Sequence, residues 1–220
     1  MKLDQNTLNI LKNYSLINPS IIIKDGSTLS AISSNKTVLS KAEVPNTFPK
    51  KFTIYDLTRF IGSISLMEDP DFSFTDKSVV ITDTSGKKIN YLYGDESSIK
   101  VHPPEKDIKL PSIDAEATLT ETNIKEIFRG AASLALPEIA ISGDGENVYL
   151  QAFNSKQPNG DSFKIVIGST DKTFTAIFKY ENLVKIMPST YKVTICSQGI
   201  SYFESDNIKY WVAVEAHSTF

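Results

Sequence analysis

The spacing of apolar residues predicts four helices in this chain. The stretches 57–64 and 124–131 place apolar side chains at positions i, i+3, i+4 and i+7, the spacing that gathers them on one face of an α-helix. A similar pattern covers 6–16, and a shorter one over 183–187 ends at Pro188, because proline cannot continue a helix. Each of these segments is therefore expected to bury one face and expose the other.

The start of each predicted helix carries a carboxylate. Asp56 is the expected N-cap of the second helix, and either Thr120 or Thr122 is the expected N-cap of the third. Such side chains accept hydrogen bonds from the first free backbone N–H groups, and a negative charge suits the positive end of the helix dipole. A structural role thus accounts for four carboxylates, which are Asp4, Asp56, Glu121 and Glu181.

Most of the remaining chain predicts β-strands. Segments such as 191–196 and 208–216 are rich in β-branched and aromatic residues, and many of them alternate apolar with polar positions. Dipeptides typical of hairpin turns separate them, and these are Asp25-Gly26, Asn35-Lys36, Ser85-Gly86, Asn159-Gly160, Gln198-Gly199 and Asp206-Asn207. Strands joined by such short turns pair antiparallel.

A stretch rich in proline and charge, 96–111, interrupts the pattern near the middle of the chain and shows no helical period. On each side of it the same order of elements is predicted: a helix, three strands, a strand that runs into a helix, and three more strands. We therefore predict a first domain over 1–95, a connector over 96–111 and a second domain over 112–220. The predicted fold class is α+β, with two similar domains that each place two helices on one face of antiparallel sheets.

The charge of the chain is unevenly distributed. It has 23 Lys and Arg residues against 26 Asp and Glu residues, a formal net charge of −3, which taken alone repels a polyanion such as DNA. Past their first turns, however, the predicted helices carry one carboxylate, Glu126, and five cations, which are Lys12, Arg59, Lys125, Arg129 and Lys185. Two interpretations stay open. The cations form either the ordinary solvated face of amphipathic helices or a surface for sequence-independent contact with phosphates.

The sequence offers little for catalysis or cofactor binding. His102 and His217 are the two histidines, and we find no metal-ligand spacing, nucleophile elbow or glycine-rich phosphate loop. Cys196 stands alone in an alternating strand and is expected to be buried. We therefore expect no enzyme activity, no cofactor and no metal. No stretch approaches the roughly 18 apolar residues of a membrane helix, and the start lacks a signal-peptide pattern, so we expect a cytoplasmic protein with no membrane partner.

Several short segments match a known family. They are Met1-Lys2-Leu3, Leu11-Lys12-Asn13, Ile17-Asn18, Ile54-Tyr55-Asp56-Leu57 with Phe60, Gly62 and Leu66, Phe153-Asn154, Val212-Ala213-Val214-Glu215-Ala216 and Ser218-Thr219. Through these segments the chain resembles, over its whole length, the DNA sliding clamp of large tailed bacteriophages, the trimeric DNA polymerase processivity factor of the DNA clamp superfamily. It departs from the family pattern at His217, where an acidic residue is usual, and in the amino-acid sequence of the connector.

The resemblance implies two clamp domains per subunit and a closed homotrimeric ring, with helices inside and strands outside. Such a ring encircles double-stranded DNA, binds it non-specifically through basic pore helices, and tethers the replicative polymerase through its C-terminal peptide for processive synthesis. The implied further partners are an ATP-driven clamp loader and factors of late transcription. The implied location is the cytoplasm of the infected bacterial host.

The resemblance also directs attention to two other surfaces. For the pocket that takes partner peptides near the connector, the candidates are Val101, Ile108, Leu110, Tyr210 and Val212, and packing in the core is the alternative role for each. For the subunit interface, the candidates on predicted edge strands are Tyr91, Tyr93, Phe163, Ile165 and Ile167. The rival function is a β-rich oligomeric structural or carbohydrate-binding virion protein, which would share the strands but has no need of cations on every helix.

Overall fold

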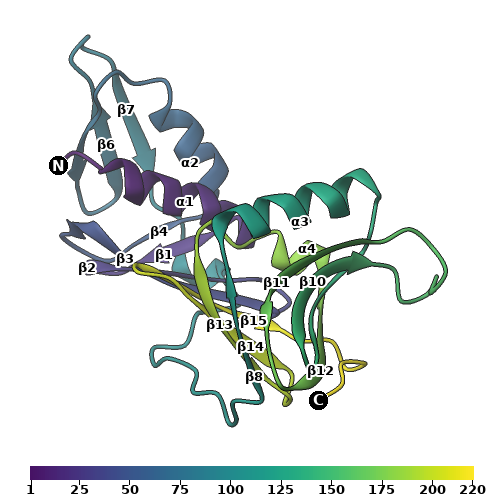
Figure 1. Cartoon of the computed structure of the whole chain (residues 1–220). Coiled ribbons are helices and arrows are strands. Elements are labelled where there is room, and N and C mark those ends of the chain that lie inside the picture. The colour runs from purple at the N-terminus through teal and green to yellow at the C-terminus, as the bar shows by residue number, and fades with distance from the viewer. The chain divides into compact units, whose positions relative to one another are not determined.

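The chain divides into two compact units. The computed structural model describes all of residues 1–220, and the units are Met1–Pro103 and Pro104–Phe220 (Figure 1). The division falls within the predicted connector 96–111, in which the only regular element is a 3₁₀ turn at Glu96–Ser98. No helix of the structure is long and apolar enough to cross a membrane.

The first unit contains two α-helices and seven strands. In chain order they are α1 (Gln5–Ile17), β1 (Ile21–Ile23), β2 (Gly26–Ile32), β3 (Val38–Phe48), β4 (Phe52–Ile54), α2 (Leu57–Ile64), β5 (Asp71–Phe74), β6 (Ser78–Thr82) and β7 (Lys88–Leu92). β1 pairs with β4, β2 pairs with β3, and β5, β6 and β7 form a three-stranded sheet, all antiparallel. α1 packs against α2 and against β3 (Figure 1).

The helices of the first unit bury the faces that the sequence predicts. In α2, Leu57, Phe60 and Ile64 are buried, which are the i, i+3 and i+7 positions of the apolar pattern. In α1 the buried Tyr14 donates a hydrogen bond through its hydroxyl to the Leu29 carbonyl at 3.3 Å and accepts one from the Ser40 hydroxyl at 3.1 Å. A buried hydroxyl needs such partners, and these two fix α1 on the hairpin of β2 and β3.

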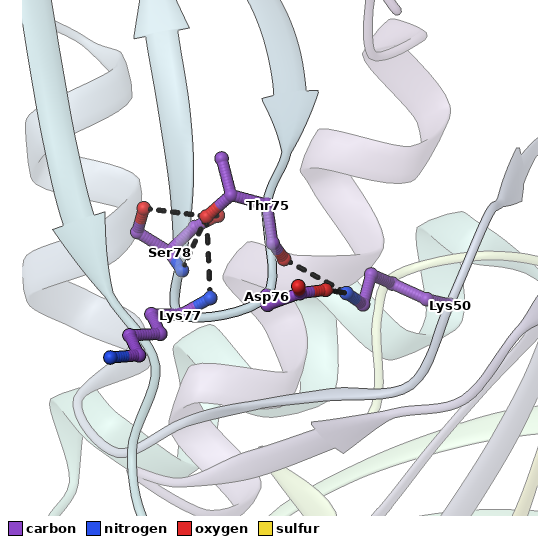
Figure 2. Close-up of polar contacts among 5 residues, drawn as sticks. All are labelled: Lys50, Thr75, Asp76, Lys77 and Ser78. Carbon is purple, nitrogen blue, oxygen red and sulfur yellow. Dashed lines mark hydrogen bonds and ion pairs between the residues drawn. The ribbon is translucent and has the colours of Figure 1, made fainter.

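The turn of the β5–β6 hairpin is tied to the turn between β3 and β4. Lys50 donates from Nζ to Asp76 Oδ1 at 2.7 Å and to the Thr75 carbonyl at 3.0 Å, as Figure 2 shows. The Thr75 hydroxyl in turn accepts the Ser78 N–H at 3.0 Å. The hydrogen bond from Lys50 lowers the pKa of the Asp76 carboxyl. These bonds fix the turn of the β5–β6 hairpin. β7 then pairs with β6 as the third strand of the sheet.

The second unit contains two α-helices and eight strands. They are β8 (Ala115–Leu119), α3 (Glu121–Ser133), β9 (Glu138–Asp144), β10 (Asn147–Phe153), β11 (Phe163–Ser169), β12 (Thr173–Lys179), α4 (Tyr180–Leu183), β13 (Tyr191–Cys196), β14 (Ile200–Glu204) and β15 (Ile208–Ala213). One antiparallel sheet has the order β11-β10-β9-β12, and another antiparallel set has the order β15-β14-β13-β8. α3 packs on β10 and β11, whereas α4 contacts β12 and β15 (Figure 1).

The observed elements follow the predicted order in both units: a helix, three strands, a strand that runs into a helix, and three strands, with β8 preceding this series in the second unit. The α+β fold class is confirmed. Thr120, and not Thr122, caps α3, and with Asn123 it forms a capping box. The fourth helix is shorter than predicted, because α4 ends at Leu183 and the chain continues in tight turns towards Pro188.

Candidate nucleic-acid interface and assembly surfaces

The first unit presents two free cations on neighbouring helices. Lys12 lies on the exposed face of α1, and Arg59 lies on the exposed face of α2, which packs beside α1. Neither side chain takes part in an ion pair within the chain. Past the caps Asp4 and Asp56, neither helix carries a carboxylate, so the exposed faces of α1 and α2 are basic.

The exposed face of α3 in the second unit has a mixed charge. Lys125 and Arg129 lie one turn apart, but Lys125 Nζ pairs with Glu121 Oε1 at 2.5 Å. Arg129 is exposed and makes no ion pair, while Glu126 is exposed on the same helix. The free positive charge of this helix is therefore concentrated at Arg129.

Lys185 does not belong to a helix face, which corrects the sequence prediction. It lies two residues beyond the end of α4 at Leu183, in a turn where its N–H donates to the Asn182 carbonyl at 3.2 Å, and it is half-buried. The prediction assumed that the apolar residues 183–187 continue the helix. Four cations, not five, thus lie on helices in this structure.

Two residues predicted at the subunit interface lie in and just after β7: Tyr91 is part of the strand, and Tyr93 follows its last residue. β7 pairs with β6 alone and so has one open backbone edge. Both tyrosines face their own unit. The Tyr91 hydroxyl donates to the Asp56 carbonyl at 2.9 Å, and the Tyr93 ring stacks on Phe52 at 5.2 Å. Burial raises the pKa of each hydroxyl. The exposed apolar side chain of this edge is instead Leu92, at 66% exposure.

Phe163, Ile165 and Ile167 alternate along β11, which pairs with β10 alone. All three are half-buried. The Phe163 ring lies against Gly130 of α3, where a Cβ atom would come within 2.4 Å of it. The exposed apolar side chain of this edge is Val166, at 62% exposure. Neither Leu92 nor Val166 is among the residues predicted from the sequence. Each lies between two of the predicted residues, on the opposite face of the strand.

The five pocket candidates do not form one surface. Tyr210 and Val212 on β15 have no exposed area, and the Tyr210 hydroxyl accepts the Met187 N–H at 3.2 Å. They are core residues, which corrects their assignment to a peptide pocket. Both faces of β15 are largely buried, so the strand has no free side for a peptide.

The other three candidates lie in the irregular stretch between the strands. In the second unit Ile108 is 39% exposed, and its carbonyl accepts the Trp211 Nε1–H at 3.0 Å. Leu110 follows it and is half-buried. In the first unit Val101 lines a shallow hollow together with Ile32. Val101, Ile108 and Leu110 are thus the predicted pocket residues that retain exposed surface.

Comparison with known proteins identifies relatives over the full length of the chain. The family model described as "gp45 sliding clamp, C terminal" matches residues 116–216. The chain is 29% identical to the sliding clamp of Vibrio phage KVP40 over 223 residues, which are 98% of this chain and all of that protein. It is 27% identical to the sliding clamp of Enterobacteria phage T4 over 228 residues, which are all of this chain and 99% of that one.

The fold has solved counterparts at much lower sequence identity. A PCNA from A. fulgidus, solved with the C-terminal region of FEN-1 bound, superposes with a TM-score of 0.71 at 12% identity, and the match covers 96% of this chain and 95% of that one. At this identity the likeness concerns the fold alone, which is the clamp fold expected from the sequence. Together with the clamp fold, these matches show that the chain is similar over its whole length to the sliding clamps of bacteriophages.

Proposed function

We propose that this sliding clamp closes as a ring of three copies around duplex DNA and holds the replicative DNA polymerase on its template. The observation that carries the DNA contact is the set of unpaired cations, Lys12, Arg59 and Arg129, on exposed helix faces of a chain whose net charge is −3. The phage relatives over the full length are sliding clamps. A structural or carbohydrate-binding virion protein is therefore not favoured.

Simple geometry supports a ring of this size. Three copies with four helices each supply twelve helices, and neighbouring axes lie about 8–10 Å apart. A circle of twelve such spacings is about 30–38 Å across, and removing about 10 Å for one helix diameter leaves a hole of about 20–28 Å. A hydrated duplex can pass through such a hole.

The chemistry of the helix faces suits sliding. Contacts from Lys and Arg to phosphates carry no sequence information and hold no register on the DNA. Few of them are available per copy, so affinity is low and falls as salt rises. We infer that the closed ring, and not the strength of binding, keeps the protein on the duplex.

We propose that the ring closes head to tail, with β7 of one copy beside β11 of the next. Each strand has one open backbone edge and one exposed apolar side chain, Leu92 and Val166. An uncovered edge of this kind readily pairs with another strand, and a head-to-tail contact that closes on itself removes all such edges. The candidates Tyr91 and Phe163 would then pack against their own units and hold the two interface strands in place.

For partners beyond DNA, we propose that the C-terminal peptide of the polymerase binds at the connector residues of the second unit that retain exposed surface, Ile108 and Leu110. A C-terminal region also occupies the A. fulgidus PCNA structure. We extend the proposal to an ATP-driven loader that opens the ring and to factors of late transcription, all in the cytoplasm of the infected bacterium. In each of these roles the chain acts as a scaffold and not as an enzyme.

Charge reversal on the helices tests the proposal. The triple variant Lys12→Glu, Arg59→Glu and Arg129→Glu is expected to lose processive primer extension with its polymerase and loader, because the helix faces then repel phosphates. The matched control, Lys36→Glu, Lys77→Glu and Lys179→Glu, changes net charge equally at exposed sites outside the helices and is expected to retain it. Equal processivity of the two variants would contradict the proposed DNA contact.

A further inference from the structure

We propose that the two end segments of the chain each cover one sheet edge and so keep β5 and β12 from competing with the pairing of β7 and β11. The segments are Met1 and the tail, defined here as residues 214–219. The inference rests on the proposed ring and adds a reason why β11, and not β12, pairs with β7 of the next copy. It concerns the strands β5 and β12, which lie at the sheet edges opposite β7 and β11.

The tail occupies the outer edge of β12 (Figure 1). Thr175 and Thr219 form an antiparallel bridge, in which the Thr175 N–H donates to the Thr219 carbonyl at 2.8 Å and the Thr219 N–H donates to the Thr175 carbonyl at 2.9 Å. Ile177 is covered as well, since its carbonyl accepts the Glu215 N–H at 2.7 Å and its N–H donates to the Ser218 hydroxyl at 2.9 Å. Four backbone groups of β12 are thereby satisfied by the tail.

A side-chain contact fastens the middle of the tail. His217 Nε2 lies 3.0 Å from Glu138 Oε1 at the start of β9, and the Glu138 side chain is only 13% exposed. The other oxygen of Glu138 accepts the Ser155 N–H at 2.7 Å. Burial by itself raises the pKa of the Glu138 carboxyl, but the hydrogen bonds from Ser155 and the neighbouring His217 outweigh it and leave the pKa below its ordinary value. The carboxylate is thus held charged beside His217.

Met1 covers β5 in the same manner. The Phe72 N–H donates to the Met1 carbonyl at 2.8 Å, and the Met1 amino group donates to the Phe72 carbonyl at 2.9 Å. The amino group also pairs with Asp71 Oδ1 at 2.5 Å. Each of the two sheets therefore has one covered edge and one open edge.

The consequence concerns the number of ways in which copies can pair. An open strand edge is a template for any other strand, so an uncovered β12 would compete with β11 for the β7 edge of another copy. A second acceptor on the same sheet would permit open chains and branched aggregates in place of a closed ring. The outer strand β8 of the other strand set instead carries charge, since exposed Glu116 pairs with Lys192 at 2.9 Å. Charged side chains on an edge strand disfavour pairing with another strand.

Removal of the tail tests this inference. A variant lacking residues 215–220 is expected to give larger, concentration-dependent assemblies by native mass spectrometry and light scattering, where the parent gives one species. Hydrogen exchange at the Thr175 and Ile177 amides is expected to rise about fivefold or more, the scale of a lost hydrogen bond. A milder variant, Thr219→Pro, keeps the tail but removes the N–H that bonds to the Thr175 carbonyl, and it is expected to shift both readouts in the same direction.

The control is Phe220→Ala, which changes an exposed residue beyond the bridge and is expected to behave as the parent. The inference is overturned if both tail variants keep the parent's single species and its exchange rates at Thr175 and Ile177. A parent that is monomeric at all concentrations would refute the proposed ring instead. In that case, self-association of the tail variants with faster exchange would still support the covering role, and its absence would refute it.

Discussion

Two glycines inside helices have opposite roles in this fold. Gly62 in α2 has nothing within 4 Å of the position that a Cβ atom would take, whereas at Gly130 in α3 that position is 2.4 Å from Cδ1 of Phe163. Gly130 thus lets the Phe163 ring lie directly on the helix backbone. The two residues look alike in the sequence, because the neighbour that distinguishes them is a strand residue more than thirty positions away.

Alanine at each glycine is expected to change stability in opposite directions. Gly62→Ala should raise the free energy of unfolding by about 0.5–1 kcal/mol, because glycine loses more conformational entropy when it enters a helix. Gly130→Ala should lower it by about 1–3 kcal/mol, because the new methyl group displaces Phe163 from a packed site. Urea unfolding of both variants measures the difference. Equal stabilisation by the two substitutions would show that Phe163 is not held against α3.

Residue positions that the sequence predicts well are those on amphipathic helices. Lys12, Arg59 and Arg129 are exposed as expected, because the helical period fixes which side chains oppose the buried face. Alternation of apolar and polar positions does not predict the exposure of Tyr210 and Val212, since a strand buried on both faces leaves no exposed side. Lys185 was misplaced because a short apolar run was interpreted as a longer helix.

At the scale of elements, capping decides where α2 begins. Asp56 Oδ1 accepts the Arg59 N–H at 2.8 Å, which satisfies a backbone donor that has no partner within the helix. Asp56→Ala is expected to cost about 1 kcal/mol of unfolding free energy, whereas Asp56→Asn keeps an acceptor and should cost far less. Urea unfolding checks both variants. If Ala and Asn are equally destabilising, the cap does not hold α2.

The order of elements and the start of α2 could be predicted from the sequence, but strand partners could not. Apolar periods and caps are local signals, and α2 begins where Asp56 indicates. By contrast, alternation looks the same in a central strand such as β10 as in the edge strand β11. Which strand lies at an edge depends on segments far along the chain, for example the tail residues that reach β12.

At the scale of the whole molecule, the repeated order of elements and the family together explain the architecture. Each unit buries its own core, and each has an open strand edge with an exposed apolar side chain, β7 with Leu92 in the first and β11 with Val166 in the second. A chain with two complementary open edges can close on further copies of itself. The proposed number of copies rests on the family resemblance, because no single-chain pattern fixes the rotation between neighbours.

Retention on circular DNA tests the central claim, a ring that encircles the duplex, most directly. The protein is diluted until it dissociates, concentrated again in the presence of nicked circular duplex, and then washed in about 1 M salt, where the Debye length is about 3 Å and phosphate contacts are screened. We predict that protein stays with the circle and leaves after a single cut makes the DNA linear. Equal retention on linear DNA, or none on the circle, would contradict the account.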